Sequence, residues 1–368
     1  MKIQIVKIKH LAVMTGMALA GLGGSGSMTP ANALTFNFTP TAATSQQARD
    51  GFAAAGALWS SLFTDDVIIN LSIDYSVLDA GTLGQASSAS NYYSYQNVYN
   101  ALNSDKTTAD DTRAVNSLSN SSTYKTLINH TTDNPNGNGS LTAYTYDSNW
   151  VEVNRANAKA LGLIGTSSTT DASISFNSLF TWDFDRSNGI SSSAYDFVGV
   201  AAHEIGHALG FVSGVDYIDG AVDSAFQSSA IAALDLFRYS TASQAVNAID
   251  ITAGTSDKYF SLDNGVTKIA SFSTGSVLGD GRQASHWKDN LGLGIMDPTS
   301  ANGELLQITN NDAQSLDVIG WNRRNTAIVP EPADFAGTFI CAAFGVKLVL
   351  KRRKYLAEVT VPERDLEV

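Results

Sequence analysis

Hydrophobic residues recur at two spacings along this chain, and each spacing predicts a different kind of element. Alternation of apolar and polar residues in DVIINLSIDYSVL, residues 66–78, predicts a half-buried strand, and ASISFNS, residues 172–178, predicts a shorter one. Alanine-rich residues 46–63 and the stretch EVNRANAKALGLIG, residues 152–165, predict helices. Between them, residues 103–149 are dense in Ser, Thr, Asn and Asp, which predicts solvated surface loops rather than core. The order of elements predicts one α+β unit.

A further helix is predicted in the second half of the chain, in AYDFVGVAAHEIGHALGF. Its apolar residues between Phe197 and Leu209 follow the helical period, and Gly210 is a plausible stop. This period places His203 and His207 one turn apart on the same face. The helix therefore brings two imidazoles together.

Composition limits what could complete a site around these histidines. With 368 residues, 43% of them hydrophobic, the chain is long enough to bury a large core, and its formal net charge of −12 argues against a nucleic-acid partner. Its single cysteine, Cys341, allows neither an internal disulfide nor a thiolate cluster. Any metal ion must therefore be held by His, Asp or Glu.

The N-terminal residues 1–33 have the pattern of a secretory signal peptide. Lys2, Lys7 and Lys9 precede an apolar run, and Ala31-Asn32-Ala33 is the small-x-small pattern that a signal peptidase cleaves. A membrane anchor is the alternative, but the run is short for a span and is diluted with glycine. The pattern predicts an exported protein whose mature chain starts near Leu34.

The C-terminal residues 327–368 have a tripartite order. Pro330-Glu331-Pro332 precedes an apolar segment, Phe335 to Leu350, and a basic cluster, Lys351 to Lys354. This order resembles the PEP-CTERM sorting signal of bacterial envelope proteins. The resemblance implies transient membrane association through this segment, processing by an exosortase-like enzyme, and an extracellular or cell-envelope location on a bacterium. A plain membrane anchor is the alternative. Residues 34–326 remain as one domain.

The residues around the two histidines have the types that hydrolytic zinc chemistry needs. Imidazoles at this spacing can bind one zinc ion at about 2.0 to 2.1 Å. Glu204, next to the first histidine, can take a proton from a water molecule as that water attacks a carbonyl carbon. The alternative is a surface helix that carries these residues by chance, because HExxH is a short pattern.

A catalytic zinc ion needs a third protein ligand. In the extended metzincin pattern HExxHxxGxxH it is a histidine three residues after the glycine, but Ser213 occupies that position here. A neutral hydroxyl is a poor replacement. Asp216 in the same loop and His286, far downstream, are the two candidates, and ligand type favours His286.

Downstream motifs resemble those of the leishmanolysin family of metzincins. The matching motifs are HEIGHALGF, Ser285-His286-Trp287, and Met296 with Pro298 in GIMDP, which is similar to a Met-turn. The resemblance covers residues 197–211 and about 285–321. It implies a zincin or metzincin catalytic domain with an active-site helix, a mixed sheet and a Met-turn, in which residues 311–321 form the C-terminal helix and His286 is the third zinc ligand.

The resemblance, together with the predicted export, implies a secreted zinc-dependent endopeptidase acting on protein or peptide substrates, with Glu204 as general base. Two alternatives stay open, namely a non-catalytic surface module with a structural zinc ion, and a zinc hydrolase of a non-peptide carbonyl substrate. We take residues 172–178 as the strand that faces the substrate, and His130, in a polar stretch, as a surface residue.

One weaker group precedes the active-site helix, in DFDRSNGI. Asp183, Asp185, Asn188 and Gly189, with Asp196 shortly after, supply oxygen ligands of the kind that Ca²⁺ prefers. The spacing has one residue too many for the EF-hand loop. The alternative is a polar turn, with a residue near Ser193 capping the helix.

Overall fold

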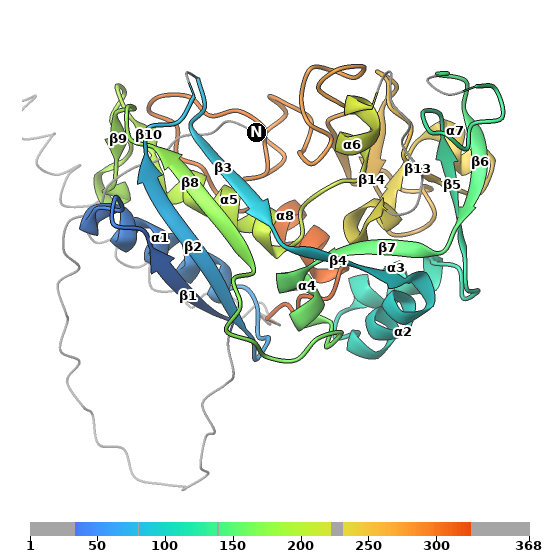
Figure 1. Ribbon diagram of the computed structural model, residues 1–368, viewed down its shortest axis with the longest axis horizontal. Coiled ribbons are helices and arrows are strands. Elements are labelled where there is room, and N and C mark those ends of the chain that lie inside the picture. The colour runs from blue at the N-terminus through green and yellow to red at the C-terminus, as the bar shows by residue number, and fades with distance from the viewer. Residues whose placement is uncertain (1–33, 80, 138–139, 222–230, 325–368) are drawn as a thin grey trace, which may run out of the picture. The chain divides into compact units, whose positions relative to one another are not determined.

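The computed structural model of the chain describes residues 34–79, 81–137, 140–221 and 231–324 (Figure 1). They belong to one compact unit that ends at Arg324. The predicted signal peptide and the predicted sorting segment lie outside the described residues. None of the described helices has the length and apolar character that a membrane span requires.

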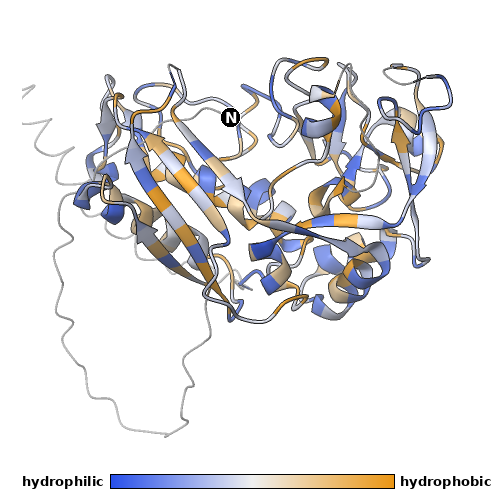
Figure 2. Ribbon diagram, in the orientation of Figure 1, coloured by the Kyte–Doolittle hydropathy of each residue, from blue (hydrophilic) through white to orange (hydrophobic). Residues whose placement is uncertain are grey.

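A four-stranded sheet forms the first layer, in the order β1 (Thr35–Pro40), β2 (Ile68–Ser76), β8 (Ala172–Asn177) and β3 (Gly84–Ser88). The first three strands are parallel, and β3 runs antiparallel to β8 at the edge. Apolar positions alternate along β2 and β8, as Figure 2 shows. The strand predictions for residues 66–78 and 172–178 are therefore confirmed, because the alternation marks the buried face of this sheet.

Two helices cover that buried face, α1 (Gln46–Ser60) and α5 (Phe197–Leu209). The ring of Phe52 on α1 lies 5.1 Å from that of Phe176 on β8 and 5.4 Å from that of Phe197 on α5. A side chain at Gly51 would meet the Phe197 ring, with a Cβ atom only 2.4 Å from it, so this glycine sets the close approach of the helices. The predictions of these two helices are confirmed.

The second part of the unit contains three small sheets. Their orders are β11 (Ile231–Ala232), β7 (Trp150–Asn154), β4 (Ser90–Ser94); β13 (Ile249–Asp250), β5 (Tyr124–Ile128), β6 (Tyr144–Ser148); and β12 (Arg238–Tyr239), β14 (Lys258–Phe260), β15 (Ala270–Phe272). The other elements are α2 (Tyr95–Asp105), α3 (Ala109–Ser117), α4 (Arg155–Ala160), β9 (Trp182–Asp183), η1 (Arg186–Asn188), β10 (Tyr195–Asp196), α6 (Val215–Gly220), η2 (Ala233–Phe237), α7 (Thr241–Ala245) and α8 (Asn310–Asp317). This mixture of helices and mixed sheets confirms the α+β class.

The structure corrects the prediction of surface loops for residues 103–149. This polar segment forms α3, β5 and β6, and its residues Thr126 and Ile128 are fully buried. The hydroxyl of Thr126 donates to the carbonyl of Tyr146, so its burial leaves no unpaired donor. The helix predicted at 152–165 is also shorter than expected, because its first residues belong to β7 and α4 ends at Ala160.

Candidate metal centre

Helix α5 is fixed at both ends by its own sequence. The carboxylate of Asp196 accepts from the backbone N–H of Gly199 at 3.0 Å and caps the first turn. Gly210 ends the helix with a φ of +127°, in the region that favours glycine. Every residue from Phe197 to Leu209 is buried, so the helix runs through the core.

Two tryptophans from opposite ends of the described chain bind the backbone of α5. The indole of Trp59 donates to the carbonyl of Ala202 at 2.8 Å, and that of Trp321 donates to the carbonyl of Leu209 at 2.9 Å. Both indoles are fully buried. They fix the helix on either side of its histidines.

Three histidines converge beside α5. The Nε2 atoms of His203 and His207 are 3.0 Å apart, and the ligand atoms of these two and of His286 all lie within 4.8 Å of one another. Each side chain is at most 5% exposed. The three histidines therefore lie close enough together to bind one metal ion.

Backbone carbonyls orient the three rings. The Nδ1 atom of His203 bonds the carbonyl of Ile295 at 2.6 Å, and that of His207 bonds the carbonyl of Phe211 at 2.6 Å. The Nδ1 atom of His286 is 3.2 Å from the carbonyl of Gln283. Because a carbonyl only accepts, each Nδ1 carries the ring proton and each Nε2 presents its lone pair to the common centre.

Burial keeps these imidazoles neutral. It lowers the pKa of His203 to about 4, and burial together with the neighbouring rings lowers the pKa of His207 and His286 well below the usual value. The Nε2 atom of His286 has no hydrogen-bond partner. Three neutral nitrogen donors, one of them unpartnered, are a set of ligands that would suit a zinc ion.

Glu204 lies beside this cluster with an unpaired carboxylate. The side chain is fully buried, and neither oxygen has a hydrogen-bond partner. Burial raises the pKa of Glu204 to about 8. A buried carboxylate without a partner is costly, which is typical of a group whose partner is a ligand or a reactant.

The two residues after Gly210 that the sequence singled out, Ser213 and Asp216, have other partners, and Asp216 lies on α6. The Ser213 hydroxyl donates to Asp235 at 2.6 Å, and Asp216 accepts from the backbone N–H of Ala284 at 2.6 Å. Asp216 is not a member of the histidine cluster. It holds the segment that carries His286 and does not replace that histidine.

Arg238 holds the same segment from the other side. It is 1% exposed and donates to the carbonyls of Ala284 and Ser273 at 3.3 and 2.8 Å. Together with Asp216, this side chain fixes the backbone two residues before His286. This role could not be predicted from the sequence, because no local pattern links Arg238 to residue 284.

Met296 packs beneath the helix that carries the first two histidines. It is fully buried, and a Cβ atom at Gly206 would lie 2.5 Å from its sulfur. The backbone N–H of Trp287 donates to the carbonyl of Met296 at 3.0 Å, which joins this turn to the His286 segment. Met296 therefore contributes packing, as its thioether suggests.

Asp312 on α8 supports both the turn and the His286 segment. Its carboxylate accepts from the backbone N–H groups of Ile295 and Met296 at 2.9 and 3.2 Å, and from the indole N–H of Trp287 at 2.8 Å. The sequence analysis missed this residue. The capping-box spacing from Thr309 to Asp312 predicts where the helix starts, but it does not predict the hydrogen bonds of Asp312 with residues distant in sequence.

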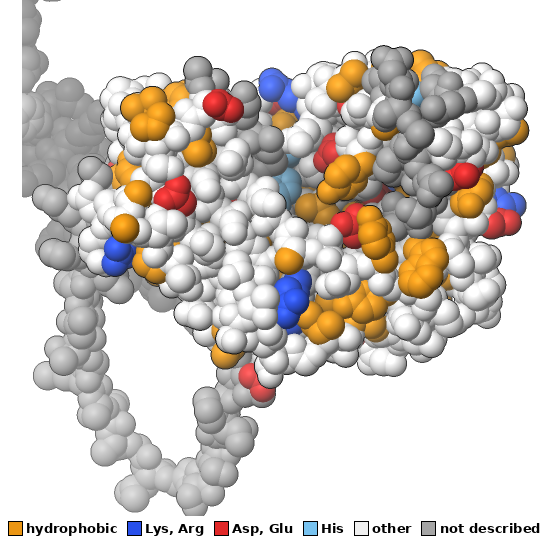
Figure 3. All heavy atoms as spheres, viewed as in Figure 1, with side chains coloured by type: hydrophobic (Ala, Val, Ile, Leu, Met, Phe, Trp, Pro, Cys, Tyr) orange, Lys and Arg blue, Asp and Glu red, His pale blue; other side chains and the backbone are white. Residues whose placement is uncertain are grey.

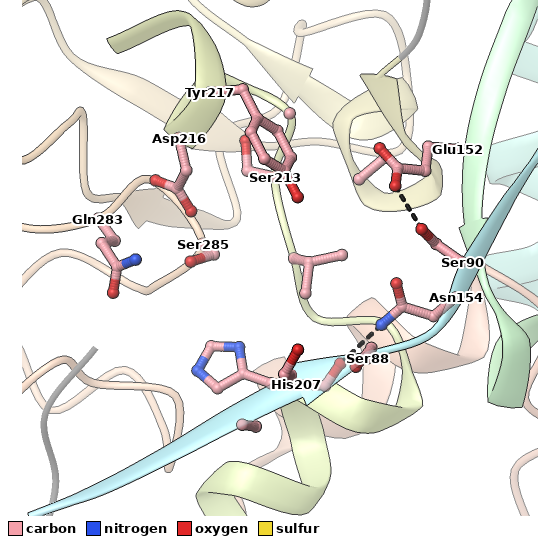
Figure 4. A pocket seen from close by; sticks show the side chains of 15 residues that line it. Ser88, Ser90, Glu152, Asn154, His207, Ser213, Asp216, Tyr217, Gln283 and Ser285 are labelled. Carbon is pink, nitrogen blue, oxygen red and sulfur yellow. Dashed lines mark hydrogen bonds between the residues drawn. The ribbon is translucent and has the colours of Figure 1, made fainter. Parts of the chain in front are cut away.

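An open cavity of about 400 Å³ adjoins His207 (Figure 4). Residues of β3, β7, α6 and the loop after α5 line it. In the space-filling view, histidine atoms are visible in a hollow, with acidic and hydrophobic side chains along one side (Figure 3). The cluster is thus buried and yet borders a cavity large enough for a ligand.

The strand that we took as facing the substrate lies inside the main sheet. Strand β8, which contains the predicted residues 172–177, pairs with β2 on one side and β3 on the other. Its backbone has no free edge. β3 is the edge strand, and Ala86, Ser87 and Ser88 at its end line the cavity.

His130 is not a surface residue, contrary to our prediction. It is 1% exposed, and its Nε2 atom forms a hydrogen bond with the carbonyl of Ala221. The residue does not belong to the histidine cluster. The polar residues around it misled the prediction, since they are buried with it.

In the candidate calcium loop, protein groups bind the side chains. Asp183 accepts from two backbone N–H groups of the loop, and Asp185 accepts from the backbone N–H of Ser187. Asp196 caps α5, the role expected for a residue near Ser193. Among the described residues, only the three histidines form a group of metal-ligand type. The geometry favours the polar turn.

No family model, no curated protein and no solved structure matches this chain. Its functional assignment therefore depends on the geometry of the site and on the motifs that build it.

Proposed function

We propose that the chain is an exported zinc-dependent endopeptidase of the metzincin type. The observation that carries the proposal is the convergence of three neutral imidazoles, His203, His207 and His286, beside the unpaired carboxylate of Glu204. When bound, a zinc ion supplies Lewis acidity, which polarises a carbonyl group and lowers the pKa of water. A group of three protein ligands rather than four favours this function over a structural zinc site.

Glu204 acts as the general base in this mechanism. Its carboxylate accepts a proton from the attacking water and then donates it to the leaving amine. The buried position of Glu204 excludes competing solvent, and the backbone carbonyls of Ile295 and Phe211 keep two of the imidazoles in the required tautomer.

Among the described residues, no strand pairs with the outer edge of β3, which favours a peptide over another carbonyl substrate. An extended peptide can add to an edge strand through main-chain hydrogen bonds, and side chains on the edge strand then set its position. Because Ser87 and Ser88 also line the cavity beside His207, a peptide on this edge passes the histidine cluster. This arrangement supports peptide-bond hydrolysis.

The test is Glu204→Gln, with cleavage of a denatured protein and zinc content as readouts. The amide keeps the shape of the side chain but removes the proton acceptor, so we expect near wild-type zinc and a loss of activity of about 10²- to 10⁴-fold. The exposed Glu304, which accepts from the backbone N–H of Ala301, provides the matched control Glu304→Gln. Full activity of the Glu204 variant would refute the mechanism, and zinc-loaded wild-type protein that cleaves no peptide would refute the function.

A further inference from the structure

The cavity beside His207 carries negative charge. Glu152 on β7 and Asp216 on α6 line it, and no lysine or arginine does. Figure 4 shows the two carboxylates on opposite sides of the cavity, with His207 at its base. A ligand in this space therefore lies between two acidic groups.

Glu152 has no cation of its own. The hydroxyl of Ser90 donates to one of its oxygens, and none of the ion pairs among the described residues includes it. The remaining polar groups around the cavity are neutral hydroxyls and amides such as Asn154 and Gln283. They can accept hydrogen bonds, but they do not neutralise the charge.

One tyrosine ring borders the same space, and a second lies next to Glu152. Tyr217 lines the cavity and is 63% exposed, and Tyr92, which is 61% exposed, stands opposite Glu152 in the pairing of β4 with β7. Burial raises the pKa of Tyr217, and the charges of Glu152 and Asp216 raise it further, because these groups face the same space. Aromatic faces beside carboxylates suit an organic cation.

His207 connects the cavity to the histidine cluster. It lines the cavity, and its ligand atom lies within 4.8 Å of that of His286, whose Nε2 atom is buried without a hydrogen bond. This unpartnered nitrogen is independent of Glu152 and Asp216. A ligand in the cavity that contacts His207 therefore lies close to the histidine cluster.

We propose that this cavity binds the side chain of a lysine or arginine adjacent to the scissile bond, with Glu152 as its charge partner. The inference rests on the proposed function and names the peptide bonds that the site selects. The cationic head pairs with Glu152, while the methylene stem packs on Ala86, Val212 and the ring of Tyr217. An aliphatic side chain leaves the carboxylate without a cation, and an acidic one is repelled.

The test uses two series of peptides, one varied at the residue before the cleaved bond and one at the residue after it. In each series, the varied position holds Lys, Arg, Met or Glu. With full-length zinc-loaded protein, we expect kcat/KM for the Lys or Arg peptide to exceed that for the Met peptide at least tenfold, and the Glu peptide to be poorest. Glu152→Gln should reduce the Lys-to-Met ratio about tenfold, while Glu304→Gln should leave it unchanged. Circular dichroism and zinc content verify that both variants are folded.

Calorimetric binding of the same peptides to the zinc-loaded Glu204→Gln protein separates the two proposals. Cleavage with no preference for basic residues overturns this inference and leaves the peptidase function intact. The same holds if Glu152→Gln does not change the ratio of kcat/KM for the Lys peptide to that for the Met peptide. Absence of all cleavage overturns the proposed function. In that case, tighter binding of the Lys peptide that is lost with Glu152→Gln still supports the cationic pocket, and equal binding of all peptides overturns it.

Discussion

Replacing Asp312 with asparagine should destabilise the protein by about 3 kcal/mol and weaken metal binding. Each of the two carboxylate oxygens of Asp312 accepts hydrogen bonds from a different set of donors. Oδ1 accepts from the indole of Trp287 and the backbone of Met296, and Oδ2 accepts from the backbone of Ile295 and from Thr309. An amide keeps only one of these oxygens, so in either orientation its NH₂ group faces at least two donors.

The magnitude follows from the bonds that are lost. A hydrogen bond to a charged group contributes about 1.5 to 3 kcal/mol, so the loss of two costs at least about 3 kcal/mol. The metal site is affected as well, because Ile295 supplies the carbonyl that orients His203 and Trp287 follows His286. Misplaced ligands should weaken zinc binding by about 10- to 100-fold, as for other groups that orient ligands.

Urea unfolding in the presence of a chelator measures the stability effect without a contribution from metal. Asp257→Asn is the matched control, because Asp257 is 54% exposed and pairs with Lys268 at the surface, so its free energy of unfolding should change by less than about 0.5 kcal/mol. Competition with a chromogenic chelator then gives the zinc affinity of each variant. If Asp312→Asn unfolds within about 0.5 kcal/mol of the wild type, our account of this carboxylate is wrong.

Other predictions concern the third ligand, pH and the extent of the catalytic unit. His286→Ala should lose zinc and activity, because it removes one of three nitrogen ligands, whereas Asp216→Ala should keep the metal with a modest loss of stability. The zinc content of each variant measures both effects. Loss of zinc from the Asp216 variant and not from the His286 variant would overturn the ligand assignment. Burial, followed by the charge of Asp111, raises the pKa of Asp317 to about 7 in the folded protein. The protonated side chain is therefore favoured by folding, and its contribution to stability is complete below about pH 4 and is lost as the pH rises to about 7. Asp317→Asn should therefore gain stability relative to the wild type across this range, and a difference in unfolding free energy that does not change with pH would contradict this. A chain shortened to Leu34–Asn325, which contains the described residues, should fold, bind zinc and cleave; a zinc-loaded but inactive product would give the C-terminal segment a catalytic role.

Features that depend on local sequence were predicted well. Helical periodicity between Phe197 and Leu209 was sufficient to place His203 and His207 on one face, because residues four apart on a helix always meet. For the third ligand, the sequence narrowed the choice to His286 and Asp216. The structure separates the two candidates, because Asp216 accepts from the backbone of Ala284 and Arg238 donates to the same residue. No local pattern encodes these contacts.

The wrong predictions all concern partners that are distant in sequence. Residues 103–149 looked solvated because they are polar, but Asn129 exchanges hydrogen bonds with the backbone of Ala253, which lets a polar segment enter the core. His130 is buried with it. The choice of residues 172–178 as the strand that faces the substrate stays a prediction, and their alternation could not show that β8 lies inside the sheet, because alternation identifies a face and does not give the order of strands.

The two indoles that bind α5 also impose a temporal order on the site. Trp59 is made early and Trp321 late, and His286 follows the two helix histidines only after a long interval of chain. For a chain that crosses a membrane N-terminus first, as the proposed export requires, the first two ligands emerge without the third and without the second indole. If the proposed function is correct, the complete set of three histidines forms only after nearly the whole domain has emerged, so the topology itself would delay metal binding and proteolysis during export.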